Sequence, residues 1–184
     1  MRQRFIRVLV ALLVLNFAKP VLAEHSSEVR SLIGVTAVRI MVEDFNPTMQ
    51  KTGLKKEQLY TIAQEALIKN GVRVLSPQEP GKVPLLYIRL SSVFGGEGYD
   101  VPLSFYLIMQ VRQMAFLEKR EDLVAKQTVA TAEEKPLFVS TWENGTMVMV
   151  TRKELFFYVK QVLTNLVGDF VRDQRMANGQ DVQN

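Results

Sequence analysis

The sequence lacks cysteine altogether and contains a single histidine, His25, and a single tryptophan, Trp142, among its 184 residues. Without cysteine the chain has no disulfide, no thiolate nucleophile and no acylated cysteine of the bacterial lipoprotein type. One imidazole falls short of the His and Cys ligands on which zinc sites depend. These absences exclude cysteine chemistry and the common zinc centres.

Long apolar runs are missing as well. The longest covers at most residues 8–18, which is short of the about 20 residues needed to span a bilayer. Three arginines precede it, and Val21-Leu22-Ala23 places small side chains at the outer positions of a cleavage site. Residues 1–23 therefore predict a secretory signal peptide and a periplasmic or secreted location. Residues 24–184 are predicted to form a single globular α/β domain without a transmembrane span.

The sequence has no excess of either charge once the predicted signal is set aside. The whole chain has 23 basic and 19 acidic residues and a pI near 9.4. All four charged residues of the first 23 are basic, so the remainder carries 19 of each sign. Nucleic-acid binders usually have a pI above about 9 and a basic face. Nucleic acid is therefore not an expected partner.

His25 falls in the polar leader that follows the signal, where chains are usually poorly ordered, so no catalytic role is predicted for it.

The first half of the predicted domain shows the pattern strand, helix, strand. Residues 32–42 are rich in Val, Ile and Thr with period-two alternation, and Asn46-Pro47 ends this strand. Apolar residues then recur at helical spacing up to Asn70-Gly71, a typical helix stop. A short strand over 72–75 follows directly. This order favours a helix packed on one face of a sheet.

The second half predicts a hairpin, one more strand and a long helix. Residues 86–91 and 103–117 alternate with period two around a glycine loop, residues 118–122 form a charged tip, and 137–142 end the sheet. Thr151 and Glu154 have the spacing of a capping box, which predicts a helix of about 27 residues up to Asn178-Gly179. The predicted fold is α/β (α+β), a single-layer mixed sheet of about five strands with two helices packed on one face.

Several segments together resemble small exported bacterial domains that have no assigned activity. These are the helix 54–70 followed by Gly71-Val72-Arg73-Val74-Leu75, the strand 85–88, the pair Thr141-Trp142 before a glycine turn, and the helix end Gly168-Asp169-Phe170-Val171. More remotely, the pattern is similar to the amino-terminal domain of the TolB protein. The resemblance implies a mixed sheet with two helices on one face and a binding or assembly role in the periplasm, and it transfers no catalytic residue.

Carboxylates are the remaining candidates for chemistry. Glu43 and Asp44 follow the first strand, and Asp169 and Asp173 share a helix face at i, i+4. Their oxygens suit a hard cation, but a calcium site needs about six to eight oxygens and no loop of the sequence supplies them. A polar strand end and a solvated helix face are the favoured interpretations. We predict no catalytic, cofactor-binding or metal-binding residue, and no cofactor.

Two motifs resemble functional signatures, but a structural role is favoured for each of them. The glycine-rich stretch 94–100 leads into a strand, whereas a phosphate loop opens into a helix, so a hairpin connection is favoured. Asn144-Gly145-Thr146 matches a glycosylation sequon, but Asn-Gly readily takes positive φ and is interpreted as a tight turn. Trp142 is interpreted as a core or sheet-edge residue.

Two classes of function remain open. The favoured one is a non-enzymatic periplasmic accessory or binding protein of the cell envelope, acting through contacts with an envelope protein partner. The alternative is a small-ligand binding protein or hydrolase whose site is built from scattered carboxylate and Tyr side chains.

With both helices on one face, the opposite face presents the outward positions of the hairpin strands. A mixture of aromatic, Arg and uncharged polar side chains there matches the composition of protein interfaces. The candidate interaction residues are Tyr87, Arg89, Tyr106, Gln110 and Arg112, with Ser91 and Ile108 beside them. The alternative interpretation is the ordinary solvated side of an amphipathic sheet.

Overall fold

The structure is a computed structural model that describes residues 26–95, 102–115 and 137–180. Its five strands form one sheet in the order β2-β1-β3-β4-β5. Both β2 and β3 run parallel to β1, whereas β3, β4 and β5 are antiparallel neighbours. The predicted five-stranded mixed sheet is therefore confirmed. The strands are β1 (Ala37–Val42), β2 (Arg73–Val74), β3 (Leu85–Gly95), β4 (Pro102–Ala115) and β5 (Leu137–Thr151).

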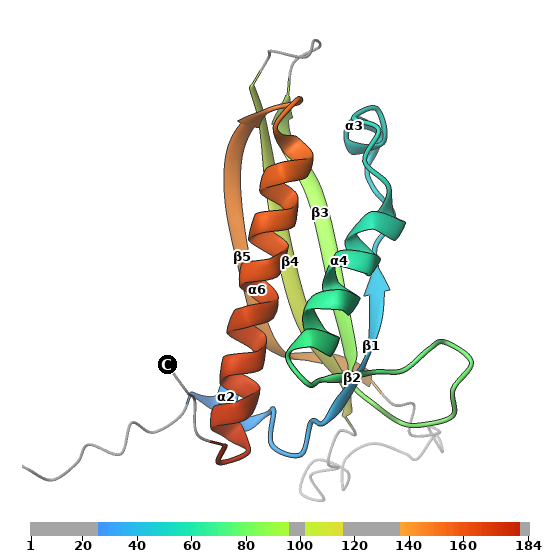
Figure 1. The fold of residues 1–184 in the computed structure, drawn as a ribbon, viewed down its shortest axis with the longest axis vertical. Helices are drawn as coiled ribbons and strands as arrows, with labels where there is room; N and C mark the ends of the chain where they lie inside the picture. The colour runs from blue at the N-terminus through green and yellow to red at the C-terminus, as the bar shows by residue number, and fades with distance from the viewer. Residues whose placement is uncertain (1–25, 96–101, 116–136, 181–184) are drawn as a thin grey trace, which may run out of the picture.

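Two long helices lie side by side on one face of this sheet (Figure 1). They are α4 (Lys56–Lys69) and α6 (Leu155–Ala177). The predicted α+β arrangement with two helices on one face is confirmed. Two single-turn helices, which the sequence analysis did not predict, complete the described elements: α2 (Ser27–Arg30) and α3 (Pro47–Gln50).

The core fills the space between the sheet and the long helices. Every second residue of β3 and β4 points into the core, and this alternation produces the period-two pattern of apolar residues in the sequence. Phe170 of α6 is fully buried there, and its ring meets the edge of Trp142 with 5.6 Å between ring centres. The core side chains of α6 are Leu155, Val159, Leu163, Leu166, Val167, Phe170 and Val171.

The strand, helix, strand unit forms as predicted. Asn70 caps α4, and Gly71 follows with a φ of 82°, a left-handed conformation that costs glycine little. The chain therefore reverses at once into β2, which pairs with β1 in parallel.

The long helix begins later than the capping-box spacing predicts. Thr151 is the last residue of β5, and α6 starts at Leu155. The Thr151 amide donates to Glu154 Oε2 at 3.2 Å, and the Thr151 hydroxyl donates to the same oxygen at 2.5 Å. These bonds lower the pKa of the Glu154 carboxyl. The Glu154 amide donates to the Thr151 carbonyl oxygen at 3.1 Å and not to the Thr151 hydroxyl, so only half of the capping box forms.

The predicted end of the sheet at Trp142 and the predicted Asn144-Gly145 turn are wrong. Both residues lie in the middle of β5, which continues to Thr151 opposite β4. Gly145 has no positive φ in this structure. Two tertiary contacts account for the extended conformation: Asn144 donates to Asp169 of α6 at 2.9 Å, and Tyr106 lies across Gly145.

Four features of the sequence analysis lie outside the described residues. They are the signal segment 1–23, His25, the glycines of 96–98 and the charged tip 118–122.

Candidate functional site

No described helix lies on the second face of the sheet, which we call the open face (Figure 1). It consists of the side chains that alternate with those of the core along β3, β4 and β5. All five predicted interaction residues are on it. Its main members are Tyr87, Arg89, Tyr106, Ile108, Gln110, Arg112, Glu143, Met147 and Met149.

Three of the predicted residues belong to one polar network. The guanidinium of Arg112 lies over the ring of Tyr87, 3.4 Å from its centre, as in a cation–π contact. Arg112 also donates from Nε and Nη2 to Gln110 Oε1 at 3.0 and 2.8 Å. Gln110 in turn donates to Glu143 Oε2. The network thus joins three strands and holds the Arg112 guanidinium in one orientation.

Glu43, which follows β1, extends this network to a fourth strand. The Tyr87 hydroxyl donates to Glu43 Oε2, and Arg89 Nε lies 4.0 Å from the same oxygen. Burial of the tyrosine, and then its hydrogen bond to Glu43, raise the pKa of Tyr87 above the ordinary value. Tyr87 therefore remains a neutral hydrogen-bond donor at physiological pH.

Tyr106 is positioned by a glycine rather than by a polar partner. A Cβ at Gly145 would lie 2.7 Å from the Tyr106 hydroxyl oxygen, closer than side chains tolerate. The tyrosine therefore crosses the neighbouring strand at the one position of β5 that has no side chain. This contact sets Tyr106 apart from the Tyr87 network.

The sequence analysis missed the part of the open face that comes from β5. Met147 and Met149 flank this face with 62% and 70% of their surface exposed. Continuing the period-two alternation past Gly145 would have found them. Because Asn144-Gly145 was interpreted as a turn, the alternation was not followed beyond it.

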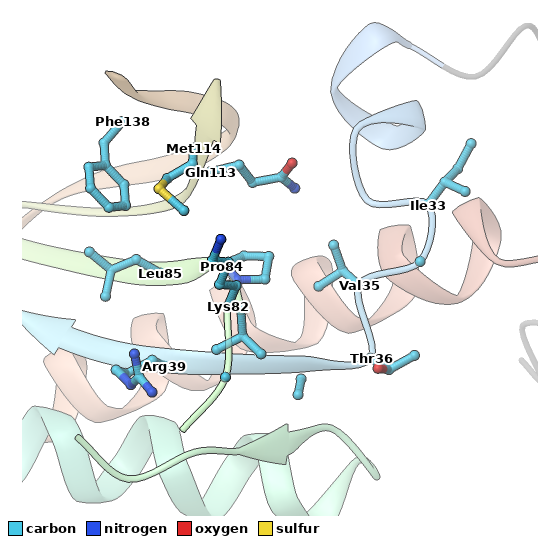
Figure 2. A pocket seen from close by; sticks show the side chains of 14 residues that line it. Ile33, Val35, Thr36, Arg39, Lys82, Pro84, Leu85, Gln113, Met114 and Phe138 are labelled. Carbon is cyan, nitrogen blue, oxygen red and sulfur yellow. The ribbon is translucent and has the colours of Figure 1, made fainter. Parts of the chain in front are cut away.

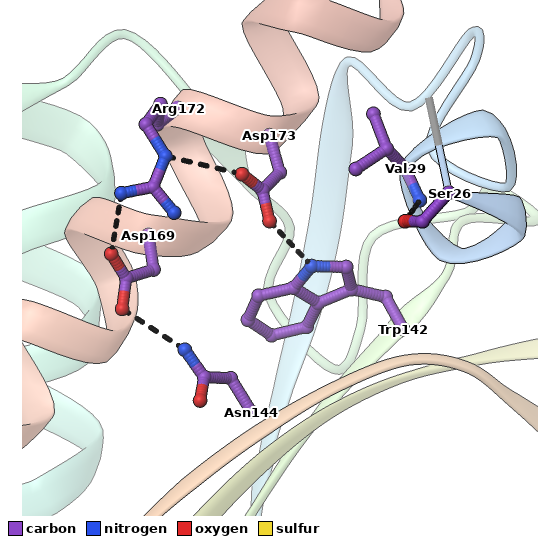
Figure 3. Close-up of polar contacts among 7 residues, drawn as sticks. All are labelled: Ser26, Val29, Trp142, Asn144, Asp169, Arg172 and Asp173. Carbon is purple, nitrogen blue, oxygen red and sulfur yellow. Dashed lines mark hydrogen bonds and ion pairs between the residues drawn. The ribbon is translucent and has the colours of Figure 1, made fainter. Parts of the chain in front are cut away.

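The acidic pairs considered as cation ligands are engaged with protein groups. Arg172 donates to Asp169 at 2.9 Å and to Asp173 at 3.2 Å (Figure 3). The second oxygens accept from Asn144 and from the Trp142 indole, the latter at 3.0 Å. The contacts of Asn144 and Trp142 fasten β5 to α6, and the two contacts of Arg172 orient the carboxylates within α6. Within the described residues no group of three or more acidic or His side chains is arranged to hold a metal ion.

The side chains of the other acidic pair, Glu43 and Asp44, point in different directions. Glu43 turns to the open face, whereas Asp44 forms an ion pair of 2.6 Å with Lys56 at the start of α4. These two carboxylates therefore do not form one site.

None of the helices in the described ranges has an apolar stretch that is long enough to cross a membrane. No protein family and no curated protein matches the chain. Among solved structures, a minor lipoprotein from Acinetobacter baumannii is similar, with 12% identity, a TM-score of 0.35, and coverage of 78% of this chain and 93% of that one. The PelC dodecamer from Paraburkholderia phytofirmans is similar with 10% identity, a TM-score of 0.43, and coverage of 77% and 87%.

Proposed function

We propose that the protein is a non-enzymatic accessory or binding protein of the cell envelope that docks a protein partner on the open face. The signal-like composition of residues 1–23 supports export. The resemblance to exported bacterial domains and, remotely, to the amino-terminal domain of TolB supports the same location and an assembly role.

The observation that carries the proposal is the composition of the open face. Tyr, Arg and Met are the residue types enriched at protein interfaces, and all three gather on this face. Met147 and Met149 expose apolar surface next to Tyr106, which pairs directly with Met147 across the strands. Methionine adapts its shape to a partner at little cost because its side chain is unbranched.

The polar network suits this role because it is already ordered. Arg112 is held by the Tyr87 ring and by Gln110 before any partner arrives, so binding costs less side-chain entropy. Both arginines of the face also have an acidic residue in or beside their network, Glu43 or Glu143. The partner surface is therefore expected to be apolar with hydrogen-bonding groups rather than strongly charged.

The alternative, a ligand or hydrolase site made of carboxylate and Tyr side chains, has less support. Such a site needs these groups around a shared cavity. Glu43, Tyr87 and Glu143 do not line the cavity of about 700 Å³ near the start of β1 and β3, nor the smaller one beside Arg152 and Leu155. A docking surface agrees better with their position on the face of the sheet that no described helix covers, where Tyr87 is 9% exposed and the methionines Met147 and Met149 are largely exposed.

Site-specific photocrosslinking in intact cells tests the proposal. A photoreactive amino acid at Met147 should yield one defined protein adduct, whereas the same group at Gln161, exposed on α6, should not. Combining Tyr106→Ala with Arg112→Ala should abolish the adduct while the melting curve stays cooperative. Equal adducts from both positions, or an unchanged adduct in a stable double variant, would place the interface elsewhere.

A further inference from the structure

A cavity of about 700 Å³ opens at the end of the sheet where β1 and β3 begin and β4 ends. This volume lies within the about 300–1,000 Å³ typical of small-molecule sites. Figure 2 shows Phe138, Met114 and Leu85 on one side, Ile33 and Val35 on the other, and Pro84 with Lys82 between them. The cavity belongs to neither the Tyr87 network nor the acidic cluster on α6.

The walls of the cavity are apolar and accessible. Ile33 and Phe138 each expose 65% of their surface, and Met114 exposes 41%. These side chains come from three separate segments that the fold brings to one place: the residues before β1, the end of β4 and the start of β5. Exposed apolar side chains that converge on a hollow are typical of ligand sites, whereas isolated ones are ordinary surface.

The charged side chains that line the cavity among the described residues are both cations, Arg39 and Lys82. Arg39 is half-buried and donates to two neutral acceptors, the carbonyl oxygens of Ser76 at 3.3 Å and Glu79 at 2.8 Å. The Glu79 carboxylate is occupied elsewhere, by Arg73 and the Ser76 amide. Within the described part of the chain, neither Arg39 nor Lys82 forms an ion pair.

A partly buried cation without a carboxylate partner favours an anion from solution. The carbonyl bonds fix the Arg39 guanidinium and leave its Nη1 group without a described acceptor. The cavity therefore combines two cationic side chains with apolar walls.

We propose that this cavity binds a single-chain amphiphile with an anionic head. Arg39 and Lys82 take the head, and Leu85, Met114 and Phe138 contact the chain. A fatty carboxylate and an anionic lysophospholipid share this chemistry. The cavity lies at one end of the same face of the sheet, since Leu85 pairs with Arg112, but its lining shares no residue with the Tyr87 network, and the binding test does not depend on the docking proposal.

Titration of the purified protein with dodecanoate, followed by displacement of the fluorescent carboxylate cis-parinaric acid, measures the binding. Dodecanoate should bind at micromolar concentrations. Dodecanol, which lacks the charge, and butyrate, which lacks the chain, should each bind at least about tenfold more weakly, since either loss removes about 1.4 kcal/mol or more. Lauroyl lysophosphatidylglycerol in the same assay distinguishes a carboxylate head from a phosphate head, and tight binding of either one supports the proposal.

Two pairs of variants assign the binding to this cavity. Lys82→Gln should weaken dodecanoate about two- to fivefold, the factor that one exposed ion pair contributes. Phe138→Ser should weaken it about tenfold through lost apolar contact. The matched controls are Lys51→Gln, an exposed lysine outside the cavity, and Phe157→Ser, whose ring is 67% exposed on α6. Both controls should bind like the unaltered protein.

Three results would overturn the proposal. Dodecanoate that fails to bind at millimolar concentration excludes the ligand class. Equal binding of dodecanoate and dodecanol excludes the anionic head. Control variants that weaken binding as much as Lys82→Gln and Phe138→Ser exclude this cavity.

Discussion

The two faces of the sheet differ in what their polar contacts connect. On the helix-covered face, polar contacts connect elements across the core, as when Trp142 of β5 donates to Asp173 of α6. On the open face, polar contacts run sideways within the sheet, from Glu43 through Tyr87 to Gln110 and Glu143. The contacts between the sheet and the helices are thus on one face, and the other face is the one on which we propose docking. Substitutions on the two faces should therefore differ in kind.

The largest expected contrast is between Phe170→Ala and Met149→Ala. Phe170 is fully buried, so its truncation should lower the free energy of unfolding by about 3–5 kcal/mol. Met149 is 70% exposed, and its truncation should change that free energy by less than about 0.5 kcal/mol. Urea denaturation of both variants measures the difference. Comparable losses would mean that the open face is covered in the folded protein.

Trp142→Phe tests how much the bond between sheet and helix contributes. The indole donates to a carboxylate in a part-buried setting, and removal of such a charged bond costs about 1.5–3 kcal/mol. The free energy of unfolding should fall by at least that amount, because Trp142 is buried and the smaller ring also loses core contacts. Asp173→Asn in the same background should then cost less than in the unaltered protein, because the two substitutions remove a shared contact. Additive losses would show that the bond contributes little.

Gly145→Ala tests the packing of Tyr106 on the open face. The new methyl would lie 2.7 Å from the Tyr106 hydroxyl oxygen and 3.2 Å from the Leu107 carbonyl oxygen. Overpacking of this kind costs about 1–3 kcal/mol. Tyr106→Ala should remove most of the added cost, and a double-mutant cycle in urea measures the relief. A cost that persists without the tyrosine would assign the clash to the Leu107 backbone.

The smallest expected effect is electrostatic. Glu43→Gln should lower the pKa of Tyr87, since the carboxylate opposes tyrosinate, and Arg112→Gln should raise it further. Ultraviolet titration against a Tyr87→Phe reference isolates this one tyrosine. A raised folded-state pKa stabilises the protein below the unfolded value near 10, and that contribution is lost as the pH rises through the folded value. Shifts in the opposite directions would contradict the network.

Sequence patterns were sufficient where the determining contacts are local. Alternation in β3 and β4 distinguishes inward from outward side chains because successive residues of any strand point to opposite sides. The stop at Asn70-Gly71 depends on the local backbone alone. These features gave the fold class and located Tyr87, Arg89, Tyr106, Gln110 and Arg112 opposite the helices.

Sequence patterns failed where a distant side chain decides the conformation. Asn144-Gly145 prefers a turn by itself, but Asp169 and Tyr106 hold it in β5. Likewise, nothing near Glu43 in the sequence indicates that Tyr87 and Arg89 converge on it. The cavity at the sheet end is built from four separate segments, 33–39, 81–85, 113–114 and 138, and has no linear signature.

The extended conformation of Asn144-Gly145 also affects the rate at which Asn144 loses its amide by deamidation. In a flexible chain, the nitrogen of the glycine attacks the asparagine side-chain carbon, and the amide is lost as ammonia through a cyclic imide. That attack requires a backbone rotation that pairing of β5 with β4 prevents, and the bond from Asn144 to Asp169 also restrains the side chain. The fold therefore protects this amide for as long as β5 stays in the sheet. Each unfolding event exposes it to deamidation, which would place a negative charge beside Asp169 and make refolding progressively less complete.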